Sequence, residues 1–464
     1  MKFKKYVLYT LVFYCGFANL ATEIIGPRLV SSIFGNTTTI WAIIISVTLV
    51  GISIGYTAGG RIPRQYADLV LPLALTANTI WFLIISWIVM KTPLLFTRPG
   101  GVASIVFTSL CAFLVPSLIF GIISPLSITL LSKDKTPQQI SRIVGNIYGL
   151  GTAGSVLGSL AAAFLLIPWV GLNASLRLFA LLMAVFSHYF LSEKLRLLTP
   201  IVLLICVLFP SPVYGLDNDL ILVADAEGYY QTIRIYTDGE NFIRMNLGSW
   251  YDSAEMDLNT LEPRLDYAVT MVELAGNVSG KRVLIIGGAG HTQARALEKR
   301  GATIVEVEID PIVVRYSDQY FGPIQGEITT QDGRAYLEHA DGEIFDHILV
   351  DAYGLNTIPT HLTTLEFFQA AQRRLKSEGK LIYNLIGVPV GPRSNSFHAL
   401  SETMATVFQD VRASRINGFQ SVNIILVASD TEMDDLNYSK APRYGRLLTD
   451  ELNPVEIYFE QALQ

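Results

Sequence analysis

The chain contains 464 residues, of which 51% are hydrophobic and only 16% are charged. Residues 1–215 contain 14 Lys/Arg and 4 Asp/Glu, whereas residues 216–464 contain 20 and 36, so a basic half precedes an acidic one and the net charge is −6. This balance argues against binding to nucleic acid, which needs a basic surface. The cysteines, Cys15, Cys111 and Cys206, all lie in apolar stretches and indicate neither disulfides nor a metal site.

Residues 1–215 have the pattern of an α-helical polytopic membrane domain, in which the few charges separate long apolar stretches. A helix that crosses a bilayer needs about 20 apolar residues. The expected spans, about seven, lie near residues 6–26, 38–59, 69–90, 101–131, 143–169, 172–191 and 197–214. The fourth is too long for one straight helix, and Pro116 and Pro125 predict a kink or a break in it. The seventh is short and bounded by prolines.

A secretory signal peptide at residues 1–19 is the competing interpretation of the amino terminus. We favour a membrane span because no small-residue cleavage site follows and further spans do. Basic residues that flank alternate spans predict a cytoplasmic amino terminus in a bacterial-type inner membrane. A true seventh span then places the acidic half outside, whereas a seventh segment that only enters the interface keeps it cytoplasmic, which we prefer; the sequence leaves both open.

Small residues in the first half recur at the spacing that lets helix backbones pack closely. They are Gly51, Gly55 and Gly59, then Gly145 and Gly149, then Gly154 and Gly158. Glu23 is the only acid well inside an apolar span, and we favour a structural contact, with Arg28 or between helices, over a transport role. No further chain of intramembrane acids marks an ion path, which argues against a coupled transporter.

The second half divides into a small β subdomain with a connecting segment, residues 216–275, and a larger domain, residues 276–464. In the subdomain "QTIRIYT" and "NFIRMNL" flank the hairpin signal "DGEN". From Lys281 onward strands such as "RVLII", "ATIVEVEID", "EITTQ", "FDHILVD" and "GKLIYNLI" alternate with helices such as "TQARALEKRG", "PIVVRYSDQYF" and "TLEFFQAAQRRLK". This alternation predicts a largely parallel sheet covered on both faces, an α/β Rossmann-like domain.

Glycines and acids follow successive strands of this domain. Ligands bind at the carboxyl ends of such strands, and a glycine-rich first turn lets a nucleotide-bearing ligand approach the backbone. Gly287, Gly288 and Gly290 form that turn, although "GGAG" is also compatible with a simple tight turn. Glu308 ends the second strand, where an acid can accept hydrogen bonds from ribose hydroxyls. Asp332 with Gly333 follows the third strand, and Asp351 follows the fourth.

These residues resemble the spermidine synthase family, polyamine aminopropyltransferases with a methyltransferase-type Rossmann fold. The segments "GYYQTIRI", "VLIIGGAG", "VEIDP", "QDGRAYL" and "VDAYG" occur in the order and spacing of that family. The stretches "CGFANLATEIIGPRLV" and "GNIYGLGTAGSVLGSLAAAFLLIPWVG" are similar to the bacterial membrane form, which fuses a multispanning domain to the synthase. The resemblance therefore covers nearly all of the chain.

The resemblance implies a role for each matched residue. Gln231 would contact decarboxylated S-adenosylmethionine, Glu308 would hold the ribose, and Asp332 with Gly333 would hold the adenine. Asp351 would be the proton acceptor, and Pro359, one residue later than in the family pattern, would border the nucleoside. The partners implied are a small-molecule amine and a lipid bilayer, with no metal, and the resemblance allows a homo-oligomer. Candidates for the substrate side are Tyr267, His291, Tyr353 and His361.

Three polyamine-facing groups of the family are missing. Gly290 replaces an acid that holds the aminopropyl amine, Gly354 replaces a second Asp, and Ala268 replaces a polar residue beside Tyr267. The nucleoside-binding acids are kept, so the cosubstrate is predicted more firmly than the acceptor. At the start of a helix the dipole disfavours a charged imidazole, which predicts a neutral, hydrogen-bonding His291.

The chemistry agrees with this interpretation. A sulfonium is a good leaving group, so aminopropyl transfer needs an unprotonated amine held in line with the carbon beside sulfur. A carboxylate such as Asp351 can take the proton of the amine and attract cationic substrates. The leading hypothesis is a membrane-bound aminopropyltransferase; the alternatives are a transferase, for example a methyltransferase, that uses S-adenosylmethionine on another acceptor, and a membrane transporter or sensor that only binds a nucleoside.

Overall fold

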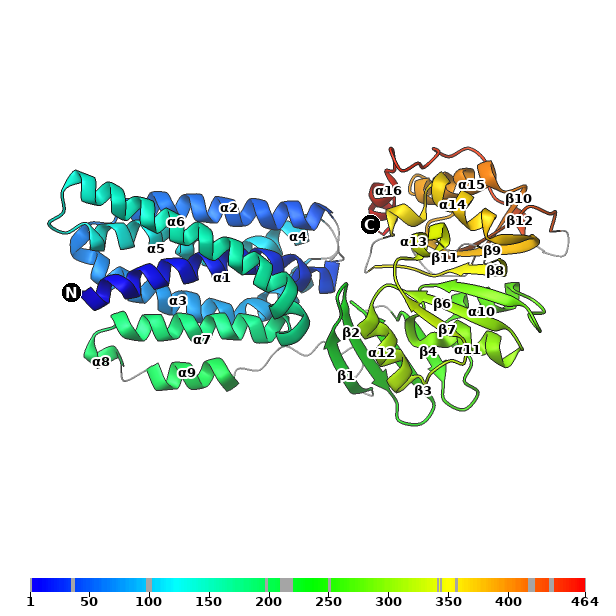
Figure 1. The fold of residues 1–464 in the computed structure, drawn as a ribbon, viewed down its shortest axis with the longest axis horizontal. Coiled ribbons are helices and arrows are strands. Elements are labelled where there is room, and N and C mark those ends of the chain that lie inside the picture. The colour runs from blue at the N-terminus through cyan, green and yellow to red at the C-terminus, as the bar shows by residue number, and fades with distance from the viewer. Residues whose placement is uncertain are drawn as a thin grey trace. The chain divides into compact units, whose positions relative to one another are not determined.

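The structure is a computed structural model, and it describes residues 2–34, 38–96, 102–196, 199–208, 220–248, 252–339, 342, 344–354, 358–415, 422–433 and 438–463. The chain divides into two compact units, Met1–Tyr214 and Gly215–Gln464 (Figure 1). The first unit is helical, and the second combines helices with two sheets. This arrangement confirms the predicted fold class: long apolar helices at the amino terminus, followed by an α/β domain of the methyltransferase type.

Among the described residues of the first unit, six helical segments are long and apolar enough to cross a membrane. They are formed by α1 (Lys2–Phe34), α2 (Thr38–Gly60), α3 (Arg64–Lys91) with η1 (Thr92–Leu95), α4 (Val102–Ser109) with η2 (Leu110–Leu114) and α5 (Val115–Leu131), α6 (Pro137–Ala161) with η3 (Ala162–Val170), and α7 (Leu172–Phe190). The first six expected spans are therefore found. Two short helices follow, α8 (Glu193–Arg196) and α9 (Thr199–Leu208).

The seventh expected span, residues 197–214, is described only in part. Its described part is the ten-residue helix α9, while residues 197–198 and 209–214 lie outside the described residues. Ten helical residues rise about 15 Å, which is about half the apolar thickness of a bilayer. The described helix α9 alone is therefore shorter than a membrane span, and the seventh span stays a prediction.

The irregularity predicted in the fourth segment is a π-helical turn, η2, which ends two residues before Pro116. Proline has no N–H, so the carbonyl of Ala112 loses the partner that it would have one turn later. The indole Nε1 of Trp81 in α3 donates to this carbonyl oxygen at 3.0 Å. A side chain from a neighbouring helix thus satisfies the group that the proline leaves free.

Glycines bring two helix pairs into close contact, as their spacing predicted. A Cβ atom at Gly154 or Gly158 of α6 would overlap the backbone oxygens of Phe13 and Phe17 in α1. In the same way a Cβ atom at Gly55 of α2 would overlap the backbone of α5. The prediction was wrong for Gly145 and Gly149, because no described atom lies within 4 Å of a Cβ built there.

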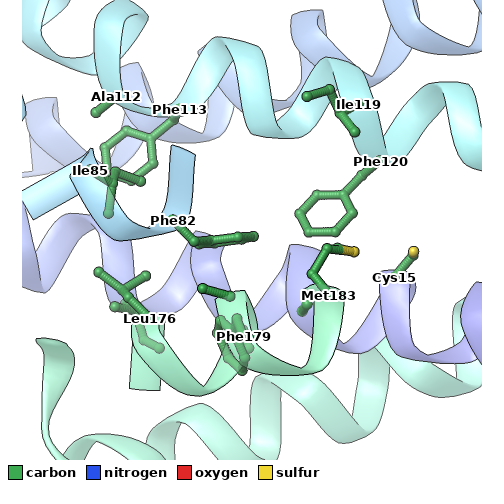
Figure 2. Close-up of a cluster of buried hydrophobic side chains, with 14 of the residues drawn as sticks. Cys15, Phe82, Ile85, Ala112, Phe113, Ile119, Phe120, Leu176, Phe179 and Met183 are labelled. Carbon is green, nitrogen blue, oxygen red and sulfur yellow. The ribbon is translucent and has the colours of Figure 1, made fainter. Parts of the chain in front are cut away.

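Apolar side chains from several helices fill the centre of the first unit. Figure 2 shows Phe82, Phe120, Phe179 and Met183 close together, and all four are buried. The rings of Phe82 and Phe179 meet edge to face at 5.8 Å between centroids. Glu23 is also buried and accepts a hydrogen bond from Thr48 Oγ1 at 3.2 Å, which is the helix-to-helix contact favoured from the sequence.

The second unit begins with an antiparallel meander of four strands, which confirms the predicted hairpin. The strands are β1 (Ile221–Glu227), β2 (Thr232–Thr237), β3 (Phe242–Leu247) and β4 (Ala254–Asp257), paired in chain order. Ile233, Ile235 and Met245 face inward and pack with Val313 and Phe321. The meander therefore rests on α12 (Pro311–Tyr320) of the larger domain and on the residue that follows it.

The larger domain contains an eight-stranded sheet in the order β12-β10-β11-β9-β8-β5-β6-β7. The strands are β5 (Arg282–Ile286), β6 (Thr303–Glu308), β7 (Glu327–Thr330), β8 (Phe345–Val350), β9 (Leu375–Gly387), β10 (Asp410–Arg415), β11 (Val422–Ser429) and β12 (Ser439–Lys440). Strands β5 to β9 run parallel, whereas β11 is antiparallel to both β9 and β10. The chain order reverses between β5 and β8, which is the place where such sheets bind ligands.

Helices cover both faces of this sheet because alternate residues of the strands point to opposite sides. On one face Leu284 and Ile286 pack with residues of α13 (Gly333–His339), α14 (Leu365–Arg373), α15 (Asn395–Val407) and α16 (Val455–Leu463). On the other face Val283 and Ile285 pack with α10 (Asp266–Leu274) and α11 (Thr292–Lys299). The apolar strand sequences that predicted a doubly covered sheet are explained by these two cores.

Candidate active site

Four predicted site residues lie at the carboxyl ends of neighbouring parallel strands. Gly287 follows β5, Glu308 ends β6, Asp332 lies two residues after β7, and Asp351 follows β8. The four strands are adjacent in the order β8-β5-β6-β7, so their ends form one edge of the sheet. The structure therefore brings together the glycine turn and the three acids that the sequence predicted as a nucleoside site.

The glycine turn is packed too tightly for side chains. Gly287 has a φ of 90°, and a Cβ atom there would lie 2.8 Å from the backbone carbon of Asp351. A Cβ atom at Gly288 would overlap the carboxyl group of Glu306. Gly290 also has a positive φ, 67°, and its missing side chain leaves room for Ala254 and Phe321. Gly290 is thus explained by contact with the meander, whereas Gly287 brings the turn against the Asp351 backbone.

Glu308 is held by the backbone on both sides. Its Oε2 accepts from the Gly288 N–H at 3.2 Å, and its Oε1 accepts from the Asp310 N–H at 3.0 Å. Burial, together with the nearby carboxylate of Glu306, raises the pKa of Glu308 to about 7, although the two backbone N–H groups oppose this change. A carboxyl group fixed in this way can present its remaining lone pairs to hydroxyl donors.

Asp332 and His361 form a pair that reaches solvent. The Nε2 of His361 lies 2.7 Å from Asp332 Oδ2, and the side chains are 45% and 31% exposed. The Oδ1 of Asp332 accepts from the Ala335 N–H at 2.9 Å. The hydrogen bond to His361 lowers the pKa of Asp332, so this carboxylate stays ionised. His361 therefore lies beside the predicted adenine-binding acid, whereas the sequence had suggested the substrate side.

Asp351 is surrounded by neutral donors. Gln293 Nε2 in α11 donates to its Oδ2 at 2.7 Å, and Asn384 Nδ2 in β9 donates to its Oδ1 at 2.8 Å. Burial raises the pKa of Asp351 to about 6, while hydrogen bonds from Asn384, Gln293 and Tyr267 hold it below the value that burial alone would give. The group is ionised at neutral pH and can accept a proton, because its pKa lies near the working range.

The two predicted tyrosines flank Asp351 in different ways. The hydroxyl of Tyr267, in the first turn of α10, donates to the carbonyl oxygen of Ser253 at 3.0 Å and lies near enough to Asp351 to lower the pKa of that carboxyl group. The hydroxyl of Tyr353 donates to the carbonyl oxygen of Asn384 at 2.6 Å and accepts from the Ile386 N–H at 3.0 Å. Tyr353 thus uses its hydroxyl to fix β9, and its ring packs against the hydrophobic core.

His291 is enclosed, contrary to the role considered from the sequence. Only 1% of the residue is exposed; its Nδ1 lies 2.5 Å from Glu306 Oε1, and its Nε2 lies 3.4 Å from Asp318 Oδ1. Burial lowers its pKa, but the two carboxylates outweigh burial and raise it overall. Two acids therefore face the ring, the buried Glu306 and the partly exposed Asp318, and they oppose the effect of the helix dipole from which a neutral imidazole was predicted. A direct contact between His291 and a substrate finds no support in this geometry.

The turn between β1 and β2 lies against the end of β6. The N–H of Tyr230 donates to Asp310 Oδ2 at 3.1 Å. Burial and the charges of Asp310, Asp332 and Glu308 raise the pKa of Tyr230, so its half-exposed ring stands near the acids of the site. The buried Oε1 of Gln231, the next residue, finds no hydrogen-bond partner among the described residues. A buried acceptor without a partner fits a residue that contacts a ligand.

Residues that sequence reasoning missed are Gln293, Asn384 and Tyr230. Asn384 carried a signal, because it is the one polar residue inside the strand "LIYNLI" and lies at its carboxyl end. Gln293 carried none, since a polar residue in the first turn of a helix is ordinary. Pro359, which was predicted, directly precedes η5 (Thr360–Leu362) in the loop that follows Asp351. Among the described residues no group of three His, Cys, Asp or Glu side chains is placed to hold a metal.

The fold defines an α/β domain of the methyltransferase type, with the candidate site at the carboxyl ends of its strands. In comparison with known proteins, residues 266–416 match the spermine/spermidine synthase domain. The chain therefore carries a spermine/spermidine synthase domain in its second unit, as its motifs predicted.

Curated relatives with similar sequences are named polyamine aminopropyltransferases. One from Bifidobacterium longum, described as probable, is 36% identical over 146 residues, 31% of this chain and 32% of the relative. One from Vibrio vulnificus is 29% identical over 199 residues, 41% of this chain and 64% of the relative. This chain thus matches less than two thirds of the length of either relative.

A relative from Aquifex aeolicus, named polyamine aminopropyltransferase 2, is 22% identical over 400 residues, 80% of this chain and 77% of the relative. That share exceeds the length of the second unit, so the similarity extends into the helical unit. A solved structure, a probable spermidine synthase from Corynebacterium glutamicum, aligns with 48% of this chain and 82% of its own at 23% identity, with a TM-score of 0.41.

Proposed function

We propose that this protein is a membrane-bound aminopropyltransferase that moves the aminopropyl group of decarboxylated S-adenosylmethionine to an amine such as putrescine. The observation that carries the proposal is Asp351, a carboxylate at the end of β8 with a pKa near 6, beside a glycine turn and the acids Glu308 and Asp332. The spermine/spermidine synthase domain at residues 266–416 supports the same reaction class.

The reaction needs one proton acceptor and good alignment. The amine nitrogen forms a bond to the aminopropyl carbon attached to sulfur, the carbon–sulfur bond breaks, and its electron pair stays on sulfur in methylthioadenosine. The new ammonium group loses a proton, which Asp351 accepts. The carboxylate can be aimed at the amine because Gln293 and Asn384 fix both of its oxygens.

The nucleoside part of the cosubstrate would be held by residues on the same sheet edge. Glu308 would accept hydrogen bonds from the ribose hydroxyls, and Asp332 with Gly333 would face the adenine. Gln231, whose buried Oε1 has no partner among the described residues, would contact the ligand from the meander. Pro359 and Tyr353 would line the loop side, because both follow Asp351 in the β8–α14 loop.

The helical unit would insert in a lipid bilayer, in line with its six long apolar helices. With six spans both ends of the unit lie on one side, and the basic residues near the amino terminus favour the cytoplasm for that side. The synthase domain would then be cytoplasmic, which is the arrangement expected if α9 lies at the membrane interface. This orientation can be tested with a reporter that fluoresces only in the cytoplasm and is fused to the carboxyl terminus. A stable fusion protein without fluorescence would contradict it.

Identification of the product tests the reaction. The purified full-length protein is incubated with decarboxylated S-adenosylmethionine or with S-adenosylmethionine, each with a panel of amines, and the products are identified by mass. Methylthioadenosine together with an aminopropylated amine supports the proposal. S-adenosylhomocysteine with a methylated product would replace it with a methyltransferase, and nucleoside binding without any product would indicate a sensor.

A further inference from the structure

The last part of the chain packs against the loop that follows Asp351. Residues 448–463 lie beyond the region that matches the synthase domain, which ends at residue 416. Leu448, Val455 and Phe459 are buried in the same core as β8 and β9. The Leu365 N–H, at the start of α14, donates to the carbonyl oxygen of Leu448 at 2.8 Å. This segment is therefore a fixed part of the domain.

On the side of Asp351, α16 contacts Tyr353. The rings of Phe459 and Tyr353 stack with centroids 6.0 Å apart and an interplanar angle of 27°. Tyr353 in turn donates to the carbonyl oxygen of Asn384, whose side-chain amide donates to Asp351. A side chain near the end of the protein thus supports the residues that hold the carboxylate.

On the side of the nucleoside acids, Asn453 holds the loop directly. Its Nδ2 donates to the carbonyl oxygen of Thr360 at 2.7 Å and to Thr363 Oγ1 at 2.9 Å. Its Oδ1 accepts from the Val455 N–H at 3.1 Å, where α16 begins. One side chain therefore ties the start of α16 to the residues directly after Pro359.

An ion pair adds a second attachment at this end. Arg334 Nη1 and Nη2 donate to the two carboxylate oxygens of Asp450, both at 2.6 Å. Arg334 stands two residues after Asp332, and its Nη1 also lies 3.5 Å from the carbonyl oxygen of His361. A bidentate ion pair between arginine and a carboxylate fixes the relative orientation of the two side chains as well as their distance. The segment is thus linked to both members of the Asp332–His361 pair.

We propose that residues 448–463 hold residues 358–364 in the conformation that binds the nucleoside, with Asn453 as the positioning residue. This inference rests on the proposed function, because it assigns the nucleoside to the Asp332–His361 side of the loop. Asn453 acts through Thr360 and Thr363 and touches no reacting atom. Its amide sets where Pro359 and His361 stand relative to Asp332.

Two variants separate the loop contact from the helix cap. Asn453→Ser and Asn453→Asp both keep an oxygen that can accept from the Val455 N–H, so α16 retains its cap, and both remove the amide donors to the loop. In the full-length protein, titration with methylthioadenosine should give a Kd about tenfold higher than wild type for each variant. The turnover number at saturating nucleoside and the KM for the amine should stay within about twofold.

Ile457→Ala is the matched control, because Ile457 lies on the same helix and is exposed. It should bind methylthioadenosine like wild type. Unchanged affinity in both Asn453 variants would overturn the proposal, and so would an equal loss of affinity, turnover and thermal stability, which is the sign of general destabilisation.

The proposed reaction can fail separately. If the wild type binds S-adenosylhomocysteine in place of methylthioadenosine, or binds a nucleoside without turnover, the aminopropyl transfer is refuted. The Asn453 variants are then compared with the wild type by their Kd for the nucleoside that the wild type binds. The same loss of affinity is expected. A wild-type protein that binds neither nucleoside overturns both proposals.

Discussion

The amide of Gln293 donates to Asp351 Oδ2 at 2.7 Å, and this contact joins the helix after the glycine turn to the end of β8. Asn384 donates to the other carboxylate oxygen from β9. Asn384 is itself held, since its Oδ1 accepts from Asn423 Nδ2 at 2.9 Å. Two elements, α11 and β9, therefore fix one carboxylate with neutral groups, and β11 holds Asn384 in place. The arrangement keeps the negative charge on Asp351 available for a cationic amine or a sulfonium.

Replacement of the Asp351 carboxylate should separate binding from turnover. Asp351→Asn keeps the size of the side chain and removes the proton acceptor, so we expect turnover to fall by about 10²- to 10⁴-fold. The affinity for methylthioadenosine should change by less than about threefold, because the ribose and adenine contacts are elsewhere. Steady-state kinetics and isothermal titration measure the two quantities. Turnover within about twofold of wild type would exclude Asp351 as the base.

Activity should depend on pH through Asp351. Its pKa is raised to about 6, so the carboxylate is ionised above this pH and protonated below it, and kcat/KM should fall as the pH drops through about 6. Gln293→Leu removes a hydrogen bond that favours the ionised form. The acidic limb should then move upward by about one pH unit. Gln319→Leu, at an exposed position of α12, is the control and should leave the limb in place.

The stability of the fold should reflect the buried carboxyl of Glu308. Its pKa is about 7 in the folded protein and about 4.5 as an isolated side chain, so the unfolded chain releases the proton first and the folded state loses stability as the pH rises from about 4.5 to 7. The loss has an upper bound of about 3 kcal/mol. Glu308→Gln should therefore melt higher relative to wild type at pH 8 than at pH 5. Thermal unfolding at the two pH values tests this; a difference independent of pH would refute it.

Close packing of α1 on α6 should make Gly154 intolerant of a side chain. A Cβ atom there would overlap the carbonyl oxygen of Phe13, and overpacking of this kind costs about 1–3 kcal/mol. Gly154→Ala should therefore lower the melting temperature of the full-length protein in detergent. Gly149→Ala is the matched control on the same helix, where no described atom lies within 4 Å. Alanine at this position should be neutral or stabilising, since it favours a helix over glycine. Equal effects of the two substitutions would contradict the packing seen in the structure.

The first six expected spans show what apolar composition can predict. Hydropathy reports how apolar a segment is, and it predicted these six helical segments because each is long and apolar enough to cross a membrane. It does not report which face of a helix packs against a neighbour. The same limit applies to Gly145 and Gly149, whose spacing matches a packing motif although no described helix faces them.

The order of motifs by itself determined the class of domain and the residues at the strand ends, including Asp351, because strand periodicity and turn chemistry are local properties of the chain. Only the tertiary structure decided which side chains surround those residues. Gln293 and Asn384 lie 58 and 33 positions from Asp351, and they meet it because α11 and β9 flank β8 in the folded domain. The surroundings of His291 likewise depend on distant residues, since Glu306 and Asp318 reach the ring from other elements. A residue type can be read along the chain, but its charge state and partners follow from contacts between distant segments.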